Sequence, residues 1–447
     1  YSASTRGAGS KNSGVHTTER FGVGSAFASA LSCLLQPCGC DGGAGNLEPR
    51  KRNMKRILIV NNNMHIGGVQ KALLNLLQAL HADYDITLLL FYRGGALLNE
   101  VPSDVRVCAA DGAFRYFGMT KNDVSTVRDR LLRTFWAGTT RVLGMPFSTR
   151  LACLLQKRIQ GFDAAISFLH SGAAHTFYGG CNAFVLNCVD AKKKITYLHC
   201  DYGQIRAASM YNADLYQRFD EIVACSDGCR RAFLNVHPQL TGKTCVIPNF
   251  QNDAAIVRLA KAQPVNLDHG RLNVLTVARF GREKGILRAL HAVAALGALR
   301  GGLRYYLIGD GLEYAEAQKA ITELGLDDTV VLLGAMENPY GYMRAADVLL
   351  IPSFSEAAPM VIHEAALLGT PILTTETSSA VEMVKDTGFG WVCPNTQAGL
   401  TQGLRRLLDA PQMLRTQREV LGGVAFDVTA AKRKFSELIN GYDEDTT

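Results

Sequence analysis

The chain has 447 residues, 47% of them hydrophobic, which is enough for two globular domains that each bury a core. Basic residues exceed acidic residues by 47 to 40, a surplus that suits an anionic substrate or membrane surface but is too small for a nucleic-acid-binding protein. No apolar run reaches the roughly 18 to 20 residues that a membrane-spanning helix needs, so we expect a protein that is soluble or lies on a membrane.

Residues 1–53 are rich in glycine, serine and alanine, lack apolar periodicity and begin without a methionine. This composition predicts a disordered tail. An apolar patch at 26–35 is similar to the core of a signal peptide, but a basic start and a buried strand follow it at Met54 instead of a clean cleavage site. We therefore expect Met54 to be the natural first residue and residues 1–53 to be additional sequence.

The chain contains twelve cysteines, and those beyond residue 40 are scattered without the paired C-x-x-C spacing of a zinc site. Buried, reduced thiols in a cytoplasmic protein are the simplest interpretation. The sequence therefore predicts neither a disulfide framework nor a metal site.

From residue 57 onward, short β-branched runs alternate with longer helical periods. A strand at 57–60, a helix at 69–80 and a strand at 86–91 follow one another, an order that predicts a parallel sheet with crossover helices. Further strands are predicted at 164–168, 195–198 and 221–225. The pattern breaks at Pro248, and the polar segment 251–270 resembles a linker.

The turn between the first strand and its helix contains Gly67 and Gly68. Two glycines here would let backbone N–H groups at a helix start face a ligand. A tight turn without a ligand fits the pattern equally well.

A second alternating series follows the linker. Its strands are predicted at 272–278, 305–308, 330–333, 348–351 and 371–374. The simplest account is an α/β protein with two consecutive doubly wound domains, at 54–250 and 271–447, that bind ligands at the carboxyl ends of their strands.

Between the early and later strands of the first domain, residues 127–159 mix arginines and lysines with large apolar side chains. This mixture suits an interfacial helix on anionic lipid. An ordinary helix with a solvated basic face is the alternative, and the sequence favours it slightly.

Two cations follow the first strand of the second domain in the run R-F-G-R-E-K-G. Arg279 and Lys284 would lie at the carboxyl end of a strand, where two cations can neutralise a diphosphate. The next strand leads into Gly309-Asp-Gly311, but Tyr314 occupies the place of the third glycine in G-x-G-x-x-G. This departure argues against a dinucleotide-dependent dehydrogenase.

A helix is predicted to begin at Pro359, directly after the loop that follows the strand at 348–351. Its first N–H groups, from Met360 and Val361 onward, would point the positive end of the helix dipole at the edge of the sheet. This arrangement is a ready site for an anion.

Two glutamates flank this helix start: Glu356 lies on the loop, and Glu364 lies a little over one turn inside the helix. Carboxylates accept hydrogen bonds from vicinal hydroxyls, so a sugar and a ribose are suitable ligands. The alternative is that Glu356 only caps the helix and Glu364 only pairs with a neighbour.

In this order, the elements resemble those of the retaining glycosyltransferases of family 4, which have the GT-B fold. The resemblance extends from about Met54 to the C-terminus and is strongest from 272 to 390. It rests on Gly67-Gly68, Tyr197-Leu-His199, Val246-Ile-Pro-Asn249, R-F-G-R-E-K-G, Gly309-Asp-Gly311 and Glu356-x7-Glu364. The resemblance implies two Rossmann-like domains facing a central cleft, the first binding the acceptor and the second binding a nucleotide-sugar donor.

The resemblance also implies a role for each residue of the second domain that matches. Arg279 and Lys284 would hold the diphosphate of the donor, Glu364 its ribose and Glu356 the transferred sugar. The backbone at Leu333 and Gly334 would hold the base, and the remaining donor contacts would come from Gly309, Met360 and Val361.

In the first domain, the resemblance places Gly67 and Gly68 near the phosphate and His199 beside the donor sugar. Asp201 would orient His199 or meet the acceptor. Ala357 and Ala358 replace a glycine-aromatic pair that is frequent in the family, so the sequence does not identify the sugar.

These implications predict a retaining, metal-independent hexosyltransferase that moves a sugar from a UDP- or GDP-linked donor to a saccharide or lipid-linked acceptor, without a further cofactor. The expected setting is bacterial cell-surface polysaccharide synthesis in the cytoplasm, with contact at the inner face of the plasma membrane. Two alternatives stay open: an epimerase or hydrolase of nucleotide sugars with the same fold, and a catalytically silent sugar-nucleotide-binding module.

Overall fold

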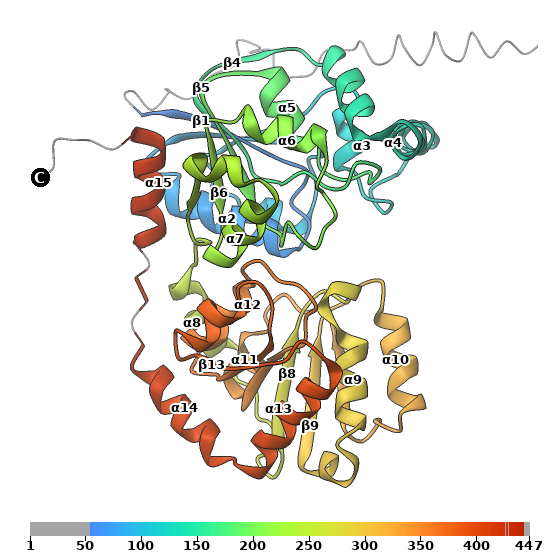
Figure 1. Cartoon of the computed structure of the whole chain (residues 1–447), viewed down its shortest axis with the longest axis vertical. Coiled ribbons are helices and arrows are strands. Elements are labelled where there is room, and N and C mark those ends of the chain that lie inside the picture. The colour runs from blue at the N-terminus through green and yellow to red at the C-terminus, as the bar shows by residue number, and fades with distance from the viewer. Residues whose placement is uncertain (1–53, 425, 428, 442–447) are drawn as a thin grey trace, which may run out of the picture. The chain divides into compact units, whose positions relative to one another are not determined.

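The computed structural model describes residues 54–441, except residues 425 and 428. The predicted disorder of residues 1–53 lies outside the described residues. The described chain forms two parallel sheets, each with its own set of helices (Figure 1).

The first sheet has seven parallel strands in the order β3-β2-β1-β4-β5-β6-β7. Its strands are β1 (Arg56–Asn61), β2 (Asp85–Leu90), β3 (Arg106–Ala109), β4 (Ile159–Ser167), β5 (Val189–Leu198), β6 (Glu221–Ala224) and β7 (Thr244–Val246). Alternate side chains of β1 enter two different cores, with Ile57 and Ile59 in one and Leu58 and Val60 in the other. This alternation is what a strand buried on both faces requires.

Helices cover both faces of this sheet and form with it the first lobe. They are α2 (Gly68–Leu80), α3 (Phe114–Gly118), α4 (Val127–Leu154), α5 (Cys181–Cys188), α6 (Met210–Gln217) and α7 (Asp227–Val236). Helix α2 contributes Leu73 and Leu77 to one core, while α5 contributes Phe184 and Val185 to the other. Short 3₁₀ turns occur at Ala96–Glu100 and Pro238–Lys243.

The second sheet has six parallel strands in the order β10-β9-β8-β11-β12-β13. Its strands are β8 (Leu272–Val277), β9 (Leu303–Ile308), β10 (Val330–Gly334), β11 (Val348–Ile351), β12 (Ile372–Thr375) and β13 (Gly390–Cys393). The chain order reverses between β8 and β11, which are neighbours, as it does between β1 and β4 in the first sheet. In open parallel sheets, this reversal point is where ligands bind.

The second lobe is completed by helices on both faces of its sheet. They are α8 (Asp253–Ala262), α9 (Ile286–Ala294), α10 (Tyr314–Glu323), α11 (Tyr340–Ala345), α12 (Met360–Leu367), α13 (Gln397–Asp409) and α14 (Gln412–Gly422). Short 3₁₀ turns occur at Arg282–Lys284 and Gly297–Gly302, and a π-helical turn at Val381–Lys385.

Two segments differ from the predicted domain plan. The segment predicted as a linker at 251–270 contains α8, whose Ile256 and Ala260 are buried in a core of the second lobe. The last helix, α15 (Ala430–Asn440), was expected with the second domain but buries Phe435, Leu438 and Ile439 in a core of the first lobe. Figure 1 shows the chain passing from α14 to α15.

Helix α4 is bent inside the predicted basic and apolar segment. Gly144 has a positive φ of 82°, and Pro146 follows two residues later. A proline removes one backbone donor and clashes with the preceding turn, which explains the kink. The inner side of α4 is buried through Trp136 and Ala152, and several large apolar residues on its outer side are exposed.

Candidate functional site

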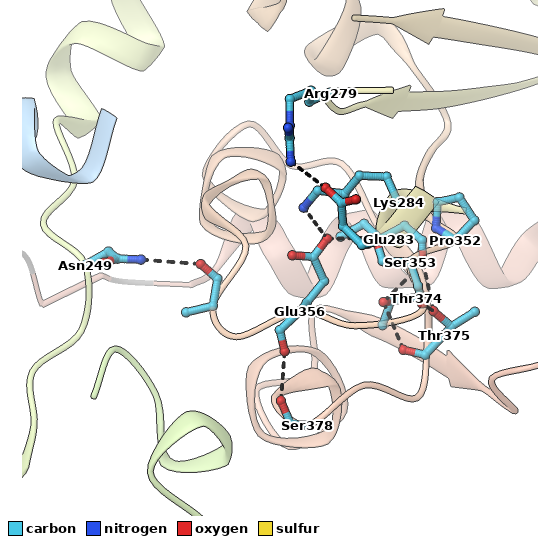
Figure 2. Close-up of polar contacts among 12 residues, drawn as sticks. Asn249, Arg279, Glu283, Lys284, Pro352, Ser353, Glu356, Thr374, Thr375 and Ser378 are labelled. Atoms are coloured by element: carbon cyan, nitrogen blue, oxygen red, sulfur yellow. Dashed lines mark hydrogen bonds and ion pairs between the residues drawn. The ribbon is translucent and has the colours of Figure 1, made fainter. Parts of the chain in front are cut away.

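The loops after β8 and β11 lie beside each other because these two strands are paired at the reversal point of the second sheet. Lys284 ends the 3₁₀ turn after β8, and its Nζ lies 2.7 Å from Oε1 of Glu356 in the loop after β11. Ser353 donates its hydroxyl to the same oxygen at 2.7 Å. Figure 2 shows this cluster. The structure therefore brings together two predicted site residues that lie 72 positions apart.

Arg279 extends from the loop after β8 and is largely exposed. Its guanidinium is 2.6 Å from Oε1 of Glu283, four residues later (Figure 2). Glu283 was not predicted as a site residue, although it lies inside the quoted run R-F-G-R-E-K-G. An exposed ion pair of this kind is weak, so a bound anion can compete for Arg279.

The glycines at 309 and 311 have a structural role that the sequence did not reveal. A Cβ at Gly309, whose φ is +145°, would lie 1.8 Å from the carbonyl oxygen of Ala278. A Cβ at Gly311 would lie 2.5 Å from the carbonyl oxygen of Phe280. The loop after β9 therefore packs directly against the loop that carries Arg279. Gly309 also donates its N–H to the carbonyl of Gly334, at the end of β10, at 2.8 Å.

Helix α12 begins as predicted, with Pro359 before its first residue, Met360, and without a side-chain cap. Glu356 therefore does not cap this helix. Met360 is buried and Val361 is half-buried, and Leu333 on β10 is half-buried as well. No side chain caps the helix start, so the N–H groups of its first turn are not bound by a capping side chain.

Glu364 of α12 is 1% exposed and does pair with another residue, but with one that is distant in sequence. Its Oε1 lies 2.5 Å from Nζ of Lys71, on α2 of the first lobe. The hydroxyl of Tyr340, on α11, lies 2.7 Å from the same Nζ and 3.4 Å from the same carboxylate oxygen. Neither Lys71 nor Tyr340 was identified from the sequence as a site residue.

The glycine turn of the first lobe lies at the start of α2. Gly67 has an extended φ of −174°, which any residue adopts, and a Cβ on Gly68 would meet no atom within 4 Å. Neither glycine has a positive φ, and a Cβ on Gly67 would meet only the flexible side chain of Gln70, 2.6 Å from its Oε1. The turn therefore does not depend on a conformation that only glycine can adopt. This finding weakens the interpretation as a tight turn without a ligand.

His199 follows β5, stacks on the ring of Tyr197 and packs against the tilted ring of Phe168. Its Nε2 is buried and has no hydrogen-bond partner among the described residues. Burial, with His170 nearby, lowers the pKa of His199 to about 3, so the imidazole is neutral at physiological pH. Asp201 hydrogen-bonds the N–H of Gly203 at 3.2 Å, so the structure does not support the predicted contact that would orient His199.

His170, which was not predicted, follows the neighbouring strand β4. It is buried, its Nδ1 lacks a partner among the described residues, and burial lowers its pKa to about 4. The signal that could have identified it is the one used for His199, a histidine directly after a predicted strand. Two neutral imidazoles therefore stand at the carboxyl ends of adjacent strands.

The described residues contain no group of three or more His, Cys, Asp and Glu side chains that could hold a metal ion. The cysteines among them are free thiols. No helix between residues 54 and 441 has the length and apolar character needed to cross a membrane.

Residues 257–420 match the family of glycosyl transferases group 1. The match covers most of the second lobe, including the Lys284 and Glu356 cluster, and leaves the first lobe outside it.

Whole-chain comparisons show the fold class. The chain superposes on Anabaena HepE in complex with UDP with a TM-score of 0.59 at 19% identity, over 87% of this chain and 100% of HepE. WaaG, a glycosyltransferase involved in lipopolysaccharide biosynthesis, gives a TM-score of 0.55 at 16% identity, over 86% of this chain and 100% of WaaG. The predicted fold, two Rossmann-like domains of the GT-B type, is confirmed.

Curated relatives match over shorter segments. The amylovoran biosynthesis glycosyltransferase AmsK of Erwinia amylovora is 32% identical over 29% of this chain and 34% of its own length. The 2-deoxystreptamine glucosyltransferase of Streptomyces kanamyceticus is 34% identical over 30% of this chain and 36% of its own length. The matches thus span about a third of these two relatives' lengths.

Proposed function

We propose that the protein is a glycosyltransferase that moves a sugar from a nucleotide-diphosphate sugar to a saccharide or lipid-linked acceptor. The observation that carries this proposal is the cluster of Arg279, Lys284 and Glu356 at the reversal point of the second sheet. Two cations there can stabilise charge on a leaving diphosphate, and the carboxylate can bind sugar hydroxyls. The match to group 1 glycosyltransferases covers this cluster.

The donor is proposed to bind mainly to the second lobe, with UDP or GDP as its nucleotide. The uncapped start of α12 adds a positive helix end beside the loop that carries Glu356. The open space at Gly68 leaves room for a phosphate to approach the first turn of α2. HepE, which has the same fold, binds UDP and UDP-glucose.

The transfer is proposed to retain the configuration of the sugar without a carboxylate nucleophile, a metal ion or a further cofactor. Glu356 is held by Lys284 and Ser353, an arrangement that suits positioning rather than attack. The leaving diphosphate can itself take the proton of the acceptor on the same face. His199 and His170, both neutral, can donate or accept hydrogen bonds to the sugar but cannot serve as cations at neutral pH.

The proposed biological role is the assembly of bacterial cell-surface polysaccharide in the cytoplasm. AmsK is an amylovoran biosynthesis glycosyltransferase, and WaaG of Escherichia coli is a lipopolysaccharide glucosyltransferase. A relative in Campylobacter jejuni transfers N-acetylgalactosamine onto a diphospho-undecaprenol saccharide. A lipid-linked acceptor is therefore included in the proposal.

A thermal-shift screen of the full chain with UDP-, GDP- and ADP-sugars tests the donor site. Binding to the folded state raises the melting temperature, by mass action, so one nucleotide class should give a shift. The shift should be lost in Glu364→Ala and reduced in Lys284→Ala. If no nucleotide sugar shifts the melting temperature of the wild type, the donor proposal fails. Donor breakdown without any acceptor would instead indicate an epimerase or hydrolase, and donor binding without turnover a silent module.

We also propose that α4 docks the protein on an anionic membrane. The large apolar side chains that α4 exposes are Val127, Leu131, Phe135, Val142, Leu143, Phe147 and Leu154. Val127, Leu131 and Phe135 are spaced by four residues, so they share one face of the helix. Beyond the kink at Gly144, Phe147 and Leu154 are exposed as well.

The charged residues of α4 indicate which kind of surface its exposed apolar residues would bind. Exposed arginines flank the apolar stripe at positions 128, 130, 141 and 150. The one acidic residue of α4, Asp129, is buried and accepts a hydrogen bond from Thr126. Exposed apolar residues bordered by cations match the boundary between acyl chains and anionic headgroups. A cavity of about 360 Å³ adjoins the end of α4 and is lined in part by Arg150, Leu154 and Arg218.

Co-sedimentation with phosphatidylcholine vesicles, with and without phosphatidylglycerol, tests this docking. The double change Arg130→Glu with Arg141→Glu should weaken binding to anionic vesicles at least about tenfold. The double change Arg405→Glu with Arg406→Glu, on α13, alters the net charge equally and should have a much smaller effect. Equal loss in both variants would indicate non-specific attraction, and a concentration-dependent dimer that buries α4 would indicate a second copy as the partner. Either result contradicts membrane docking by α4.

A further inference from the structure

Lys71 connects the proposed nucleotide site to the first lobe. It lies three residues after Gly68 on α2, and its Nζ is 2.5 Å from Oε1 of Glu364 and 2.7 Å from the hydroxyl of Tyr340. Glu364 and Tyr340 belong to α12 and α11 of the second lobe. The contact thus joins the glycine turn of one lobe to the carboxylate that is proposed to bind ribose in the other.

The electrostatics of this contact favour a charged pair. Glu364 is almost fully buried, and an unpaired carboxylate in such a place is strongly unfavourable. Burial alone would lower the pKa of Lys71, but the Glu364 carboxylate and the Tyr340 hydroxyl together outweigh burial and raise this pKa above its usual value. Lys71 is therefore an ammonium, and its contact with Glu364 is a charge-assisted hydrogen bond.

The two carboxylate oxygens of Glu364 differ in their hydrogen-bond partners. Lys71 and Tyr340 both bind Oε1, and no other described residue donates a hydrogen bond to Glu364. Oε2 of Glu364 consequently has no hydrogen-bond partner among the described side chains. A carboxylate can accept about four hydrogen bonds in total, so Oε2 keeps its capacity for a ligand.

We infer that Lys71 is a positioning residue of the nucleotide site, which fixes Glu364 through Oε1 so that Oε2 accepts the vicinal hydroxyls of the donor ribose. This inference rests on the proposed function, because it assumes a nucleotide at this site. It also gives α2 a role in donor affinity, although α2 belongs to the lobe that is expected to bind the acceptor. Residues of both lobes would then contribute to the ribose site.

The competing explanation is that the pair only holds the two lobes together. Other contacts already do so: Glu382 accepts the N–H of Gly228 at 2.9 Å, and Ser226 donates to the carbonyl of Ala357 at 2.6 Å. A purely structural pair would change the melting temperature without changing nucleotide affinity in proportion. A positioning residue would change affinity, and would do so only while Glu364 is present.

Isothermal titration of the full chain with UDP, GDP and ADP separates these explanations. For the nucleotide that the wild type binds, Lys71→Met should weaken binding about tenfold or more, because a charge-assisted contact that orients Glu364 is lost. Lys71→Arg keeps the charge and should stay within about threefold of the wild type. In the Glu364→Gln background, adding Lys71→Met should weaken binding less than about twofold further.

Lys193→Met is the matched control. Lys193 is also a lysine that joins distant segments, since its Nζ donates to the carbonyl of Leu438 on α15 at 2.7 Å. This variant should lower the melting temperature and leave nucleotide affinity unchanged.

Three results would count against the inference in different ways. Unchanged affinity in a folded Lys71→Met variant would overturn it and leave the donor site standing. Full additivity of Lys71→Met and Glu364→Gln would show that Lys71 acts on the ligand independently of Glu364, which also overturns it. If the wild type binds none of the three nucleotides, the proposed donor site itself fails and the inference fails with it.

Discussion

The two glutamates that flank the start of α12 are each held by a lysine, but the two lysines come from different lobes. Lys284 holds Glu356 from a loop of the same lobe, while Lys71 holds Glu364 from the other lobe. The first pairing could be predicted from sequence, because both residues follow strands whose carboxyl ends meet at one edge of a parallel sheet. The second could not, because it depends on how two separate sheets approach each other.

The neutral state of His170 has a consequence for stability that can be measured. Its pKa is about 4 in the folded protein against an ordinary value of 6.5, so the unfolded chain takes up a proton first as the pH falls. Stability is therefore lost progressively between about pH 6.5 and pH 4 and is unaffected by this residue above pH 7. At pH 5, this effect of His170 costs about 2 kcal/mol.

Urea unfolding of the wild type and of His170→Gln, at pH 7 and pH 5, tests this prediction. Glutamine carries no charge at either pH, so the variant should lose about 2 kcal/mol less than the wild type between the two values. Titrating groups that do not interact with His170 are shared and cancel in the difference. His170 helps to lower the pKa of His199, so its removal should also reduce the loss that His199 causes, which is a change in the same direction. An identical loss in both proteins would mean that the folded state accommodates the protonated imidazole of His170.

At the scale of elements, the central strands could be predicted from sequence and most edge strands could not. The central strands β1, β4, β8 and β11 are apolar runs that pack on both faces, which is the strongest signal a parallel sheet gives. The edge strands β3, β7 and β13 were missed. Each has only three or four residues, and β3 begins with the exposed Arg106, so neither length nor apolar pattern distinguishes it from a loop.

The loops at the site depend on packing between neighbouring elements, which the motif G-x-G alone does not reveal. Changing Gly309→Ala places a Cβ 1.8 Å from the carbonyl oxygen of Ala278 and forces alanine to adopt a φ of +145°. Backbone strain of this kind costs at least about 2 kcal/mol, and the clash would displace the loop that carries Arg279. We expect a lower melting temperature together with weaker binding of the donor nucleotide.

Gly301→Ala is the control for this prediction, because a Cβ there meets no atom within 4 Å and its φ is not positive. Thermal unfolding and nucleotide titration should show near wild-type behaviour for Gly301→Ala. Normal affinity in a destabilised Gly309→Ala variant would mean that the loop after β8 keeps its position despite the clash.

At the scale of the whole molecule, sequence order and packing disagree at the C-terminus. The chain completes the second lobe through α14 and then adds α15 to the first lobe, where Lys55 and Lys193 donate hydrogen bonds to the carbonyls of Ile439 and Leu438. The amphipathic pattern of α15 predicts a buried face but does not identify the surface that covers it. The prediction of two consecutive domains was therefore right about the sheets and wrong about the last helix.

The position of α15 makes the first lobe dependent on the end of the chain. Phe435 is fully buried and packs edge-on against Tyr84, with ring centroids 5.7 Å apart, and against Phe250, with centroids 6.2 Å apart. Removing its ring in Phe435→Ala should cost about 3 to 5 kcal/mol, because the cavity that remains is bounded by rigid strands and helices. Phe435→Leu, which fills most of the space, should cost much less.

Hydrogen exchange can show which of the two lobes α15 stabilises. Hydrogen exchange of the Phe435→Ala variant should accelerate in β1 and β2, which belong to the core that contains Phe435. Exchange in β8 and β11 should change little, although these strands are far nearer to Phe435 in sequence. Faster exchange confined to the second lobe would mean that α15 stabilises the lobe from which the chain emerges, contrary to the packing described here.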